Sequence, residues 1–390
     1  MGTLKGAAMA RIRLGMVGGG RDAFIGAVHR IAARLDDHYV LVAGALSSTP
    51  EKAQASGRDL GLAPDRIYDD FEAMAKREAR LKDGIEAVAI VTPNHMHADP
   101  AIAFLKRGIH VICDKPLTAN LQDARRLKRA AEKSGALFIL THNYTGYPMV
   151  RQARDMVLNG ALGDIRVVQA EYPQDWLSRD LEVSGQKQAA WRTDPAQSGA
   201  GGSIGDIGTH AFNLLSFVTE LQVSEICAEL TSFVPGRALD DNAQVLLRFD
   251  GGARGMLWSS QVATGHENSL ALRVYGSEGG LEWRQEDPNY LWFTPLGEPR
   301  RRITRGGAGA GESAARMTRI PPGHPEGYLE GFANIYGEAA LAIAAHRSGA
   351  PCPEDVMFPG MEDGLLGMAF IDACVTSSKK GGVWQKLRDI

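Results

Sequence analysis

The stretch IRLGMVGGG, residues 12–20, decides the fold. Its apolar first part, residues 12–17, has the pattern of a buried strand and runs directly into Gly18, Gly19 and Gly20, after which a helical pattern begins. Side chains at these three positions would keep a phosphate away from the backbone N–H groups, and the turn needs φ values that glycine adopts cheaply. The stretch therefore predicts a turn that binds the pyrophosphate of a dinucleotide at a helix N-terminus.

The same alternation of strand and helix continues to about residue 141. Runs that are apolar throughout, such as YVLVAGAL at 39–46 and EAVAIV at 86–91, are separated by amphipathic stretches. Strands buried on both faces and joined by helices are typical of a parallel sheet with helices on both sides. We predict a doubly wound Rossmann domain over residues 10–142. The residues before it carry no such pattern, and we expect a disordered leader there.

Beyond residue 160 the pattern changes to successive half-buried strands. Hairpin turns are indicated at Asp250-Gly251-Gly252 and at Ser277-Glu278-Gly279-Gly280. We therefore predict that residues 143–390 form an α+β domain with a mainly antiparallel sheet. Its helices are expected at residues 149–158, 206–219, 328–348 and 361–378. The segment 298–319 is rich in Gly, Arg and Ser without a period, and we expect it to be a mobile surface loop.

The glycine turn departs from the usual dinucleotide fingerprint. After Gly18 and Gly20 the third position is Ala23, and the next glycine, Gly26, comes three residues too late. We infer a short insertion in this turn.

The end of the second strand bears on the choice of cofactor. NAD-binding domains often place an acidic residue there for the ribose 2′-hydroxyl, whereas this chain has Ser47 and Ser48, followed by Lys52. Serine and lysine can bind the 2′-phosphate of NADP, but Lys52 fits equally well on the solvated face of the next helix. The sequence thus leaves NAD and NADP open.

Two further polar segments follow strands of the expected parallel sheet. One is Thr92-Pro93-Asn94-His95-Met96-His97 and the other is Cys113-Asp114-Lys115-Pro116. Either alone is adequately explained as a turn. Because both follow the carboxyl ends of parallel strands, where ligands bind in open α/β sheets, we expect them at one site with the glycine turn. His95 and His97 resemble a metal-binding pair, but no third ligand lies at a recognisable spacing, so no metal site is predicted.

Composition excludes several classes of function. The 43 basic and 46 acidic side chains give a net charge of −3, which provides no long-range attraction to nucleic acid or to an anionic membrane. No apolar run reaches the roughly 18 residues that a membrane helix needs. The four cysteines are widely spaced without a CxxC pair, which fits a reducing compartment, so we expect a cytoplasmic protein that acts on a small molecule.

The chain resembles the glucose–fructose oxidoreductase, inositol dehydrogenase and rhizopine catabolism (Gfo/Idh/MocA) family over nearly its whole length. The resemblance rests on four motifs: Gly18-Gly19-Gly20, Thr92-Pro93-Asn94-x-x-His97, Asp114-Lys115-Pro116 in place of the commoner Glu-Lys-Pro, and Gly201-Gly202-x-x-x-Asp206-x-x-x-His210. It implies a Rossmann domain and a C-terminal domain for substrate binding, whose open sheet packs against another subunit in a homodimer or homotetramer.

The resemblance also implies a set of cofactor-binding residues for NAD or NADP. They are Gly18, Gly19, Gly20, Ala23, Phe24, Ser47, Ser48, Lys52, Thr92, Pro93, Asn94, His97, Asp114, Lys115 and Asn143.

Asp206, His210 and Lys115 are the candidate catalytic residues. Asp206 and His210 are four positions apart on a helical pattern and thus share one side of it. Oxidation of a secondary alcohol requires a base for the hydroxyl proton, and histidine suits that role near neutral pH. In the family's Lys-Pro motif, Lys115 would stabilise the developing alkoxide, and Asp206 would orient these groups or bind a substrate hydroxyl. The alternative is that His210 is a packed structural residue and that Lys115 is an exposed lysine in a turn.

Substrate contacts are expected at residues that resemble those of sugar dehydrogenases, including levoglucosan-type enzymes. They are Gln174, Asp175, Trp176, Trp191 and Arg192, together with Asp206 and His210. Aromatic faces suit sugar rings, and Arg192 suits either hydroxyls or an anionic substituent. Asn213 and Thr145 depart from the residues that many members carry, which leaves the substrate's identity open.

Three functions compete at this point. The first is an NAD(P)-dependent dehydrogenase of a sugar, sugar derivative or cyclitol. The second is a glycosidase that oxidises a ring hydroxyl transiently with tightly held NAD⁺ and cleaves by elimination. The third is a binding protein without turnover, which intact Lys115 and His210 argue against.

Overall fold

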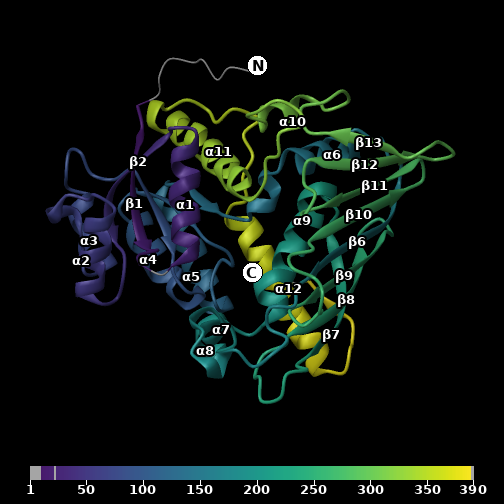
Figure 1. The fold of residues 1–390 in the computed structure, drawn as a ribbon, viewed down its shortest axis with the longest axis horizontal. Coiled ribbons are helices and arrows are strands. Elements are labelled where there is room, and N and C mark those ends of the chain that lie inside the picture. The colour runs from purple at the N-terminus through teal and green to yellow at the C-terminus, as the bar shows by residue number, and fades with distance from the viewer. Residues whose placement is uncertain (1–9, 22, 388–390) are drawn as a thin grey trace. The chain divides into compact units, whose positions relative to one another are not determined.

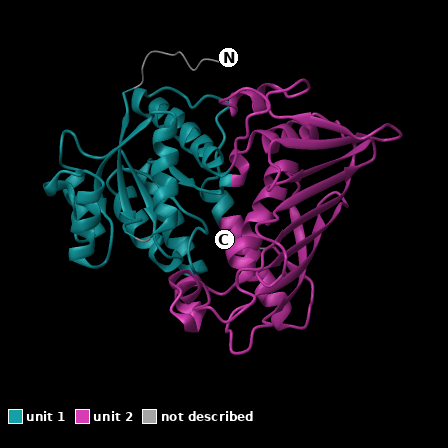
Figure 2. Cartoon of the chain, viewed as in Figure 1, with its two compact units in different colours: residues 1–143, 328–364 teal, residues 144–327, 365–390 magenta. Residues whose placement is uncertain are grey.

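The computed structural model describes residues 10–21 and 23–387, and the chain divides into two compact units (Figure 2). Unit 1 comprises Met1–Asn143 and Tyr328–Gly364, and unit 2 comprises Tyr144–Gly327 and Leu365–Ile390. The expected leader, apart from Ala10, lies outside the described residues.

Unit 1 is built on a five-stranded parallel sheet in the order β2-β1-β3-β4-β5 (Figure 1). The strands are β1 (Ile12–Gly18), β2 (Tyr39–Ala45), β3 (Ala87–Val91), β4 (His110–Cys113) and β5 (Phe138–Leu140). The helices are α1 (Phe24–Leu35), α2 (Pro50–Asp59), α3 (Phe71–Glu78), α4 (Ala98–Leu105), α5 (Leu121–Ser134) and α11 (Tyr328–Ser348). The predicted Rossmann fold is confirmed. The strand order reverses between β1 and β3, which is where open α/β sheets bind ligands.

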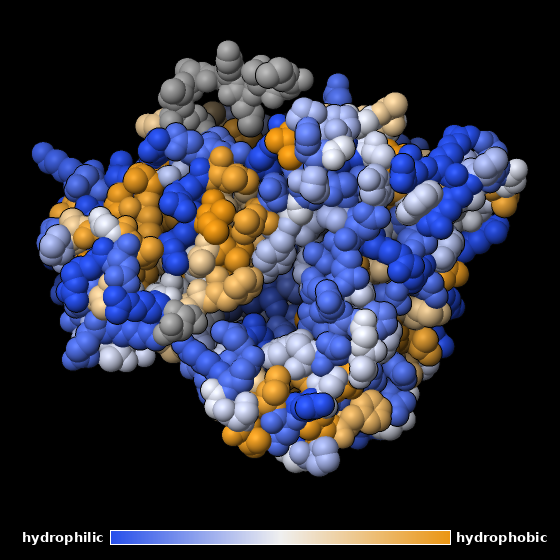
Figure 3. All heavy atoms as spheres, in the orientation of Figure 1, coloured by the Kyte–Doolittle hydropathy of each residue, from blue (hydrophilic) through white to orange (hydrophobic). Residues whose placement is uncertain are grey.

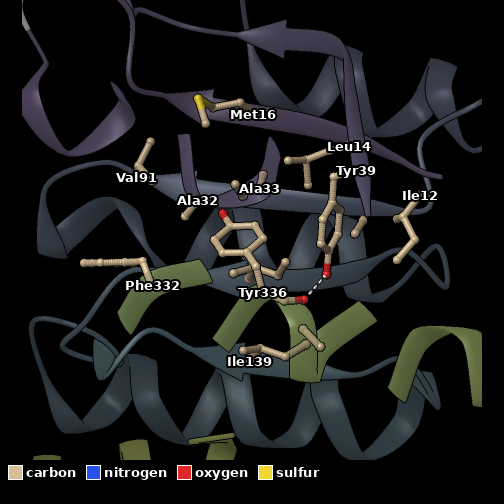
Figure 4. Packing of buried hydrophobic residues seen from close by; sticks show 14 of the residues in the cluster. Ile12, Leu14, Met16, Ala32, Ala33, Tyr39, Val91, Ile139, Phe332 and Tyr336 are labelled. Carbon is tan, nitrogen blue, oxygen red and sulfur yellow. Dashed lines mark hydrogen bonds between the residues drawn. The ribbon is translucent and has the colours of Figure 1, made fainter. Parts of the chain in front are cut away.

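The core of unit 1 includes a helix from far along the chain. Phe332 and Tyr336 of α11 pack with Ile12, Leu14 and other residues of the sheet and of α1 in one buried cluster (Figure 4). The Tyr39 hydroxyl donates a 2.9 Å hydrogen bond to the carbonyl oxygen of Tyr336. This packing places residues 328–364 in unit 1 and differs from the prediction of one continuous domain over 143–390. The bounds of α11 itself are as predicted, but its pattern does not reveal its partner.

Unit 2 contains a nine-stranded sheet in the order β13-β12-β11-β10-β6-β9-β8-β7-β14. The strands are β6 (Ile165–Pro173), β7 (Val223–Thr231), β8 (Asn242–Phe249), β9 (Arg254–Ser260), β10 (Ala271–Gly276), β11 (Gly279–Arg284), β12 (Tyr290–Pro295), β13 (Arg301–Thr304) and β14 (Gln385–Lys386). Among the described strand pairs of this sheet only β6 and β9 run parallel, so the predicted mainly antiparallel sheet is confirmed. The β8–β9 and β10–β11 hairpins occur at the predicted turns.

One face of this sheet is covered by helices. α9 contacts β6, β9 and β10, and α6 contacts β11 and β12. Among the described residues, the remaining α-helices and the π-helix are α6 (Pro148–Leu158), α7 (Lys187–Arg192), α8 (Pro195–Ser198), the π-helix η5 (Ile204–Gly208), α9 (Thr209–Thr219), α10 (Glu312–Arg316) and α12 (Met361–Lys379). The helix expected at 206–219 is thus two segments, because its first turn is π-helical.

The expectation of a mobile loop at 298–319 is wrong. This segment contains β13 and α10, and Arg305 between them is buried. The Arg305 guanidinium lies 2.9 Å from the Glu326 carboxylate and 2.7 Å from Asn289 Oδ1. A buried, multiply bonded arginine orders the segment, whereas its Gly and Arg content in the sequence is typical of a solvated loop.

No helix among the described residues is long and apolar enough to cross a membrane. Polar and apolar side chains are intermixed over much of the face in Figure 3, with an apolar area over α1. Phe24, Ile31 and Leu35 of α1 are exposed there.

Candidate active site

The glycine turn at the end of β1 is formed by close backbone packing. Gly18 and Gly19 have φ values of +78° and +70°, in the left-handed region that favours glycine. An ideal Cβ on Gly26 would lie 2.4 Å from Cα of Gly19, so α1 packs against the residue that follows β1 with no room for a side chain. Gly26 therefore performs the helix-to-strand packing that the fingerprint assigns to its third glycine, and Ala23 is the N-cap residue of α1.

The rest of this turn lies against the end of β2. The Gly20 N–H donates a 3.1 Å bond to the Leu46 carbonyl, and a Cβ on Gly20 would lie 2.6 Å from that oxygen. Ser47 Oγ accepts a 3.2 Å bond from the Thr49 N–H, and Lys52 lies in the first turn of α2. A glycine-lined strand-to-helix turn of this kind fits the pyrophosphate of a dinucleotide.

Strand register brings the predicted segments to the same edge of the sheet. Gly18 pairs with Val91, Ile90 pairs with Cys113, and Cys113 pairs with Leu140, so the carboxyl ends of β1, β3, β4 and β5 lie side by side. Thr92, Pro93 and Asn94 follow β3, Asp114 and Lys115 follow β4, and Asn143 follows β5. The described structure of unit 1 thus groups the predicted cofactor residues at one edge.

His97 connects the two motif segments through hydrogen bonds to their backbones. Its ring is buried, with Nδ1 2.8 Å from the carbonyl oxygen of Pro116 and Nε2 2.9 Å from that of Thr92. Burial lowers the pKa of His97, so the neutral ring dominates and donates to one of the two carbonyls at a time. His95 is exposed, and no group of three His, Cys, Asp or Glu among the described residues is arranged to hold a metal ion.

Asp114 is held as a carboxylate beside Lys115. Thr141 Oγ1 donates a 2.9 Å bond to Asp114 Oδ1, and His29 Nε2 lies 3.8 Å from the same oxygen. Burial tends to raise the pKa of Asp114, but the nearby His29 ring, followed by the charges of Lys115 and His97, holds it well below its usual range. An ionised Asp114 places a negative charge next to Lys115 in the chain.

His29 and His142 belong to this group of residues, and the sequence analysis missed both. The buried His29 ring lies 2.9 Å from the Tyr336 hydroxyl through Nδ1. Burial, with the charge of Lys115 as a second cause, lowers the pKa of His142 to about 3, so its ring is neutral. A histidine on the buried side of α1 was the only sequence signal, since Tyr336 comes from a distant helix.

In unit 2, Asp206 lies in the π-helical turn and His210 in the first turn of α9. The Thr209 N–H donates to the Ile204 carbonyl, five residues back, which defines the π turn. Asp206 Oδ2 accepts hydrogen bonds from Arg192 Nε at 3.2 Å and from Gln261 Nε2 at 2.9 Å. π-Turns within helices occur frequently at functional sites.

His210 is surrounded by aromatic side chains. The Tyr144 ring lies nearly perpendicular to it at 4.9 Å between centroids, and the Tyr172 ring lies at 6.2 Å. The two tyrosine hydroxyls are 2.5 Å apart, and Tyr172 also donates to Asn268 Oδ1 at 2.7 Å. The histidine therefore lies among groups that fix its ring and exclude water from part of it.

The predicted substrate residues form a connected polar and aromatic group. The Arg192 guanidinium lies 4.3 Å from the ring centroid of Trp191 and 6.0 Å from that of Trp176. Trp176 Nε1 donates to Gln174 Oε1 at 3.1 Å, and Gln174 donates to Asn268 at 2.7 Å. Asp175 instead accepts a 3.0 Å bond from the Gly265 N–H, which orders the loop after β9.

The sequence analysis missed Gln261, Asn268 and Tyr172 in this group. Gln261 and Asn268 lie in the irregular segment after β9, where no motif marked them. Tyr172 is two residues before Gln174 on β6, but its pattern was that of an ordinary strand residue.

The two units carry the features of nicotinamide-linked oxidoreductases. Unit 1 has a dinucleotide turn with a lysine at the same sheet edge. Unit 2 has a histidine four residues after a carboxylate that is paired with an arginine. Residues 12–144 match the model of the oxidoreductase family with an NAD-binding Rossmann fold, and residues 150–282 match the GFO/IDH/MocA C-terminal domain. The chain belongs to this family, so the resemblance is confirmed and the Rossmann domain is an NAD-binding one.

Solved structures and curated relatives agree with this assignment. The crystal structure of an oxidoreductase from Sinorhizobium meliloti is 64% identical, with a TM-score of 0.88 over 97% of this chain and 100% of that chain. An inositol dehydrogenase homolog from Azotobacter vinelandii complexed with NAD⁺ is 37% identical, with a TM-score of 0.94 over 97% of this chain and 98% of that one. An uncharacterized oxidoreductase of Bacillus subtilis, YfiI, is 35% identical over 97% of both chains.

Proposed function

We propose that the chain oxidises a secondary ring hydroxyl of a neutral sugar, sugar derivative or cyclitol. The observation that carries this proposal is the pairing of Asp206, four residues before His210, with Arg192, which also lies over the ring of Trp191. Such a group offers hydrogen bonds and ring faces without a net charge. A solved structure of the Azotobacter vinelandii inositol dehydrogenase homolog holds NADH and myo-inositol, and that protein is 36% identical to this chain.

Each catalytic residue has a distinct role in the proposed reaction. Bound NAD⁺ supplies the acceptor for the hydride that leaves the carbinol carbon. His210 accepts the hydroxyl proton as the carbonyl double bond forms, and Lys115 stabilises negative charge on that oxygen. Asp206 binds a neighbouring substrate hydroxyl and holds Arg192. The products are the ketone, the reduced cofactor and a proton, which His210 returns to solvent.

The pairing of Arg192 with the Asp206 carboxylate argues against an anionic substrate. Its guanidinium already lies 3.2 Å from Asp206 and over the face of Trp191. A phosphate or carboxylate on the substrate would have to compete with Asp206 for this arginine, and the Asp206 carboxylate would repel it. We therefore expect myo-inositol and glucose to be better substrates than inositol 1-phosphate and glucuronic acid, by at least about tenfold in kcat/KM.

The NAD-dependent glycosidase has no support from the relatives described above, which are named as oxidoreductases or an inositol dehydrogenase homolog. Net hydride transfer is therefore the function that we propose.

The deciding experiment is a screen of inositols, monosaccharides, 1,6-anhydro sugars and aryl glycosides with NAD⁺ or NADP⁺. Absorbance at 340 nm reports reduced cofactor, and a separate assay reports released aglycone. We expect reduced cofactor with a polyol. Aglycone release without net reduction would overturn the proposal.

Substitutions test the assigned roles. We expect Lys115→Ala and His210→Ala to lower kcat at least about 10³-fold while NADH fluorescence still reports binding. Lys106→Ala and His324→Ala, which remove exposed side chains of the same types, should retain wild-type rates. Wild-type kcat in either active-site variant would remove that residue from the mechanism.

We further propose that NAD is preferred to NADP. The nearest arginine after the glycine turn, Arg21, is bound at 2.6 and 2.8 Å by both carboxylate oxygens of Asp59. A 2′-phosphate would have to displace that acid. Steady-state kinetics should give a higher kcat/KM for NAD⁺. The opposite ratio would reject this preference.

For assembly, we propose a homodimer or homotetramer through the open face of the unit 2 sheet. Leu246 and Met256 face each other across β8 and β9 and are both exposed, and Tyr275 of β10 is exposed too. Large exposed apolar side chains on one sheet face are typical of interfaces.

Substitutions that place charged side chains on that sheet face test the proposed assembly. The double variant Leu246→Asp, Met256→Asp should sediment as a monomer, whereas Val183→Asp, at another exposed apolar residue, should leave the oligomer intact. A monomeric wild-type protein would contradict the proposal.

A further inference from the structure

Two consecutive aspartates immediately before β8, Asp240 and Asp241, are both buried. Neither belongs to the motifs described above, and neither is exposed enough to be a solvated surface acid. Buried carboxylates are costly unless several hydrogen bonds satisfy them, so their partners show what they hold in place.

Asp240 binds three consecutive residues at the entry to the π turn. Its Oδ1 accepts a 2.7 Å bond from the Gly202 N–H, and its Oδ2 accepts a 2.8 Å bond from the Ile204 N–H. Its main-chain oxygen accepts a 2.7 Å bond from the Ser203 N–H. A Cβ on Gly202 would lie 2.0 Å from that same oxygen, so the glycine is required for this contact.

One further hydrogen bond connects each of the two carboxylate contacts to the segment that carries the candidate catalytic residues. The Gly202 carbonyl accepts a 2.9 Å bond from the Asp206 N–H. The Ile204 carbonyl accepts the π-turn bond from Thr209, the residue before His210. Gly202 and Ile204 thus support the catalytic segment through their carbonyl oxygens, and Asp240 binds the N–H groups of both residues.

The neighbouring Asp241 supports Asp206 from the other side. Its carbonyl oxygen accepts a 2.7 Å bond from the Gln261 N–H, and Gln261 in turn donates to Asp206 Oδ2. The Asp241 carboxylate is occupied by the N–H groups of Phe233 and Val234 and by Arg237. The two aspartates therefore hold both elements that set the position of the Asp206 carboxylate.

We propose that Asp240 is a positioning residue for hydride transfer: its two carboxylate oxygens hold the π turn in the form that presents Asp206 and His210 to substrate. The inference rests on the proposed function of these two residues. A carboxylate suits the role because two N–H groups point at two oxygens. Asparagine would keep one acceptor and turn its NH₂ group toward the second N–H, which it cannot bond.

The test compares Asp240→Asn with Glu326→Gln. Glu326 is also buried in unit 2 and also accepts from two backbone N–H groups, those of Arg319 at 2.7 Å and Ile320 at 2.8 Å. Both variants lose a buried acid, but only Asp240 contacts the π turn. Steady-state kinetics would use the polyol with the highest rate in the screen above, with NADH binding by fluorescence and amide hydrogen exchange by mass spectrometry.

We expect Asp240→Asn to lower kcat at least about tenfold, with little change in the KM for NAD⁺, and to speed exchange at 202–204 and 206–210. Asp240→Glu, which keeps both oxygens, should lose less activity than Asp240→Asn and covers the case in which the asparagine variant does not fold. Glu326→Gln should change stability without lowering kcat.

Two results would overturn the inference: wild-type kcat in Asp240→Asn and Asp240→Glu, or an equal loss in Glu326→Gln. His210→Ala distinguishes a failure of the proposed function from a failure of the positioning role of Asp240. If that variant is fully active, the proposed function fails. If it is inactive while Asp240→Asn is fully active, only the positioning role fails.

Discussion

Gly26 of α1 packs against Gly19 of the glycine turn, so closely that an ideal Cβ on Gly26 would lie 2.4 Å from Cα and 2.6 Å from the carbonyl oxygen of Gly19. The helix therefore constrains the position of the turn. Any side chain at residue 26 must push the turn away from the position in which its N–H groups meet a pyrophosphate.

Gly26→Ala should weaken both folding and cofactor binding. Overpacking against backbone costs about 1–3 kcal/mol, and we expect the Kd for NADH to rise at least about tenfold. The control is Gly337→Ala, because Gly337 lies within α11 with no atom within 4 Å of its ideal Cβ. Alanine there should stabilise by roughly 0.5–1 kcal/mol. Urea unfolding and NADH titration measure both effects, and an unaltered Kd in Gly26→Ala would reject the coupling.

The same contact shows what the sequence could and could not predict. The strands of unit 1 and the hairpins of unit 2 follow from local apolar periods and turn residues, and the structure confirms them. Gly26 was read as misplaced because the fingerprint counts residues along the chain, whereas the packing depends on where the helix crosses the strand.

The parts that could not be predicted depend on contacts between distant segments. The pattern of α11 gives a helix but not its partner in unit 1, and the buried pair of Arg305 and Glu326 orders a segment that looks like a solvated loop. In the candidate site, the motif residues could be predicted from the sequence, whereas Gln261 and Asp240 carry no local signal because their partners are remote in sequence. His29 has only its place on the buried side of α1, which does not reveal Tyr336 as its partner.

His97 should support the lysine segment rather than contact substrate. Its ring bonds the carbonyls of Pro116 and Thr92, so His97→Ala frees both segments and leaves buried carbonyls without that donor. We expect a loss of about 1–3 kcal/mol in the free energy of unfolding, with a fall in kcat of roughly tenfold or more.

The matched control is His110→Ala. His110 is also buried in unit 1, but it accepts the Leu137 N–H at the amino end of β4, away from both motif segments. It should lose stability while retaining kcat. If the two variants lose kcat equally after correction for folded fraction, His97 has no specific role.

Arg192 should act on substrate binding through its geometry as well as its charge. Lysine keeps the charge but not the planar group that donates to Asp206 while stacking on Trp191. We expect Arg192→Lys to lower kcat/KM for the polyol about tenfold with an unchanged Kd for NADH. The control is Arg154→Lys, since Arg154 stacks on Phe217 and pairs with Glu220 outside the site. Equal kinetics in wild type and Arg192→Lys would contradict the assignment.

The buried position of Asp240 predicts a pH dependence of stability. Burial, opposed by its backbone hydrogen bonds and reinforced by the charge of Asp241, raises the pKa of Asp240 to about 6. The facing groups are Asp241 and Cys374 of α12. Because the unfolded pKa is about 3.9, the folded state binds this proton more tightly. The resulting stability is present below about pH 4 and is lost as pH rises through 6.

Asp240→Asn removes this titration, so the difference between variant and wild type isolates it from every other group. The unfolding free energy of Asp240→Asn minus that of wild type should rise by about 2 kcal/mol between pH 4 and pH 7, which is most of the roughly 3 kcal/mol that two units at about 1.4 kcal/mol each give over the full range. Urea unfolding at half-unit pH steps measures this difference. A flat difference would mean that Asp240 titrates alike in the folded and unfolded chain, and a fall with pH would mean that its partners stabilise the carboxylate beyond the cost of burying it.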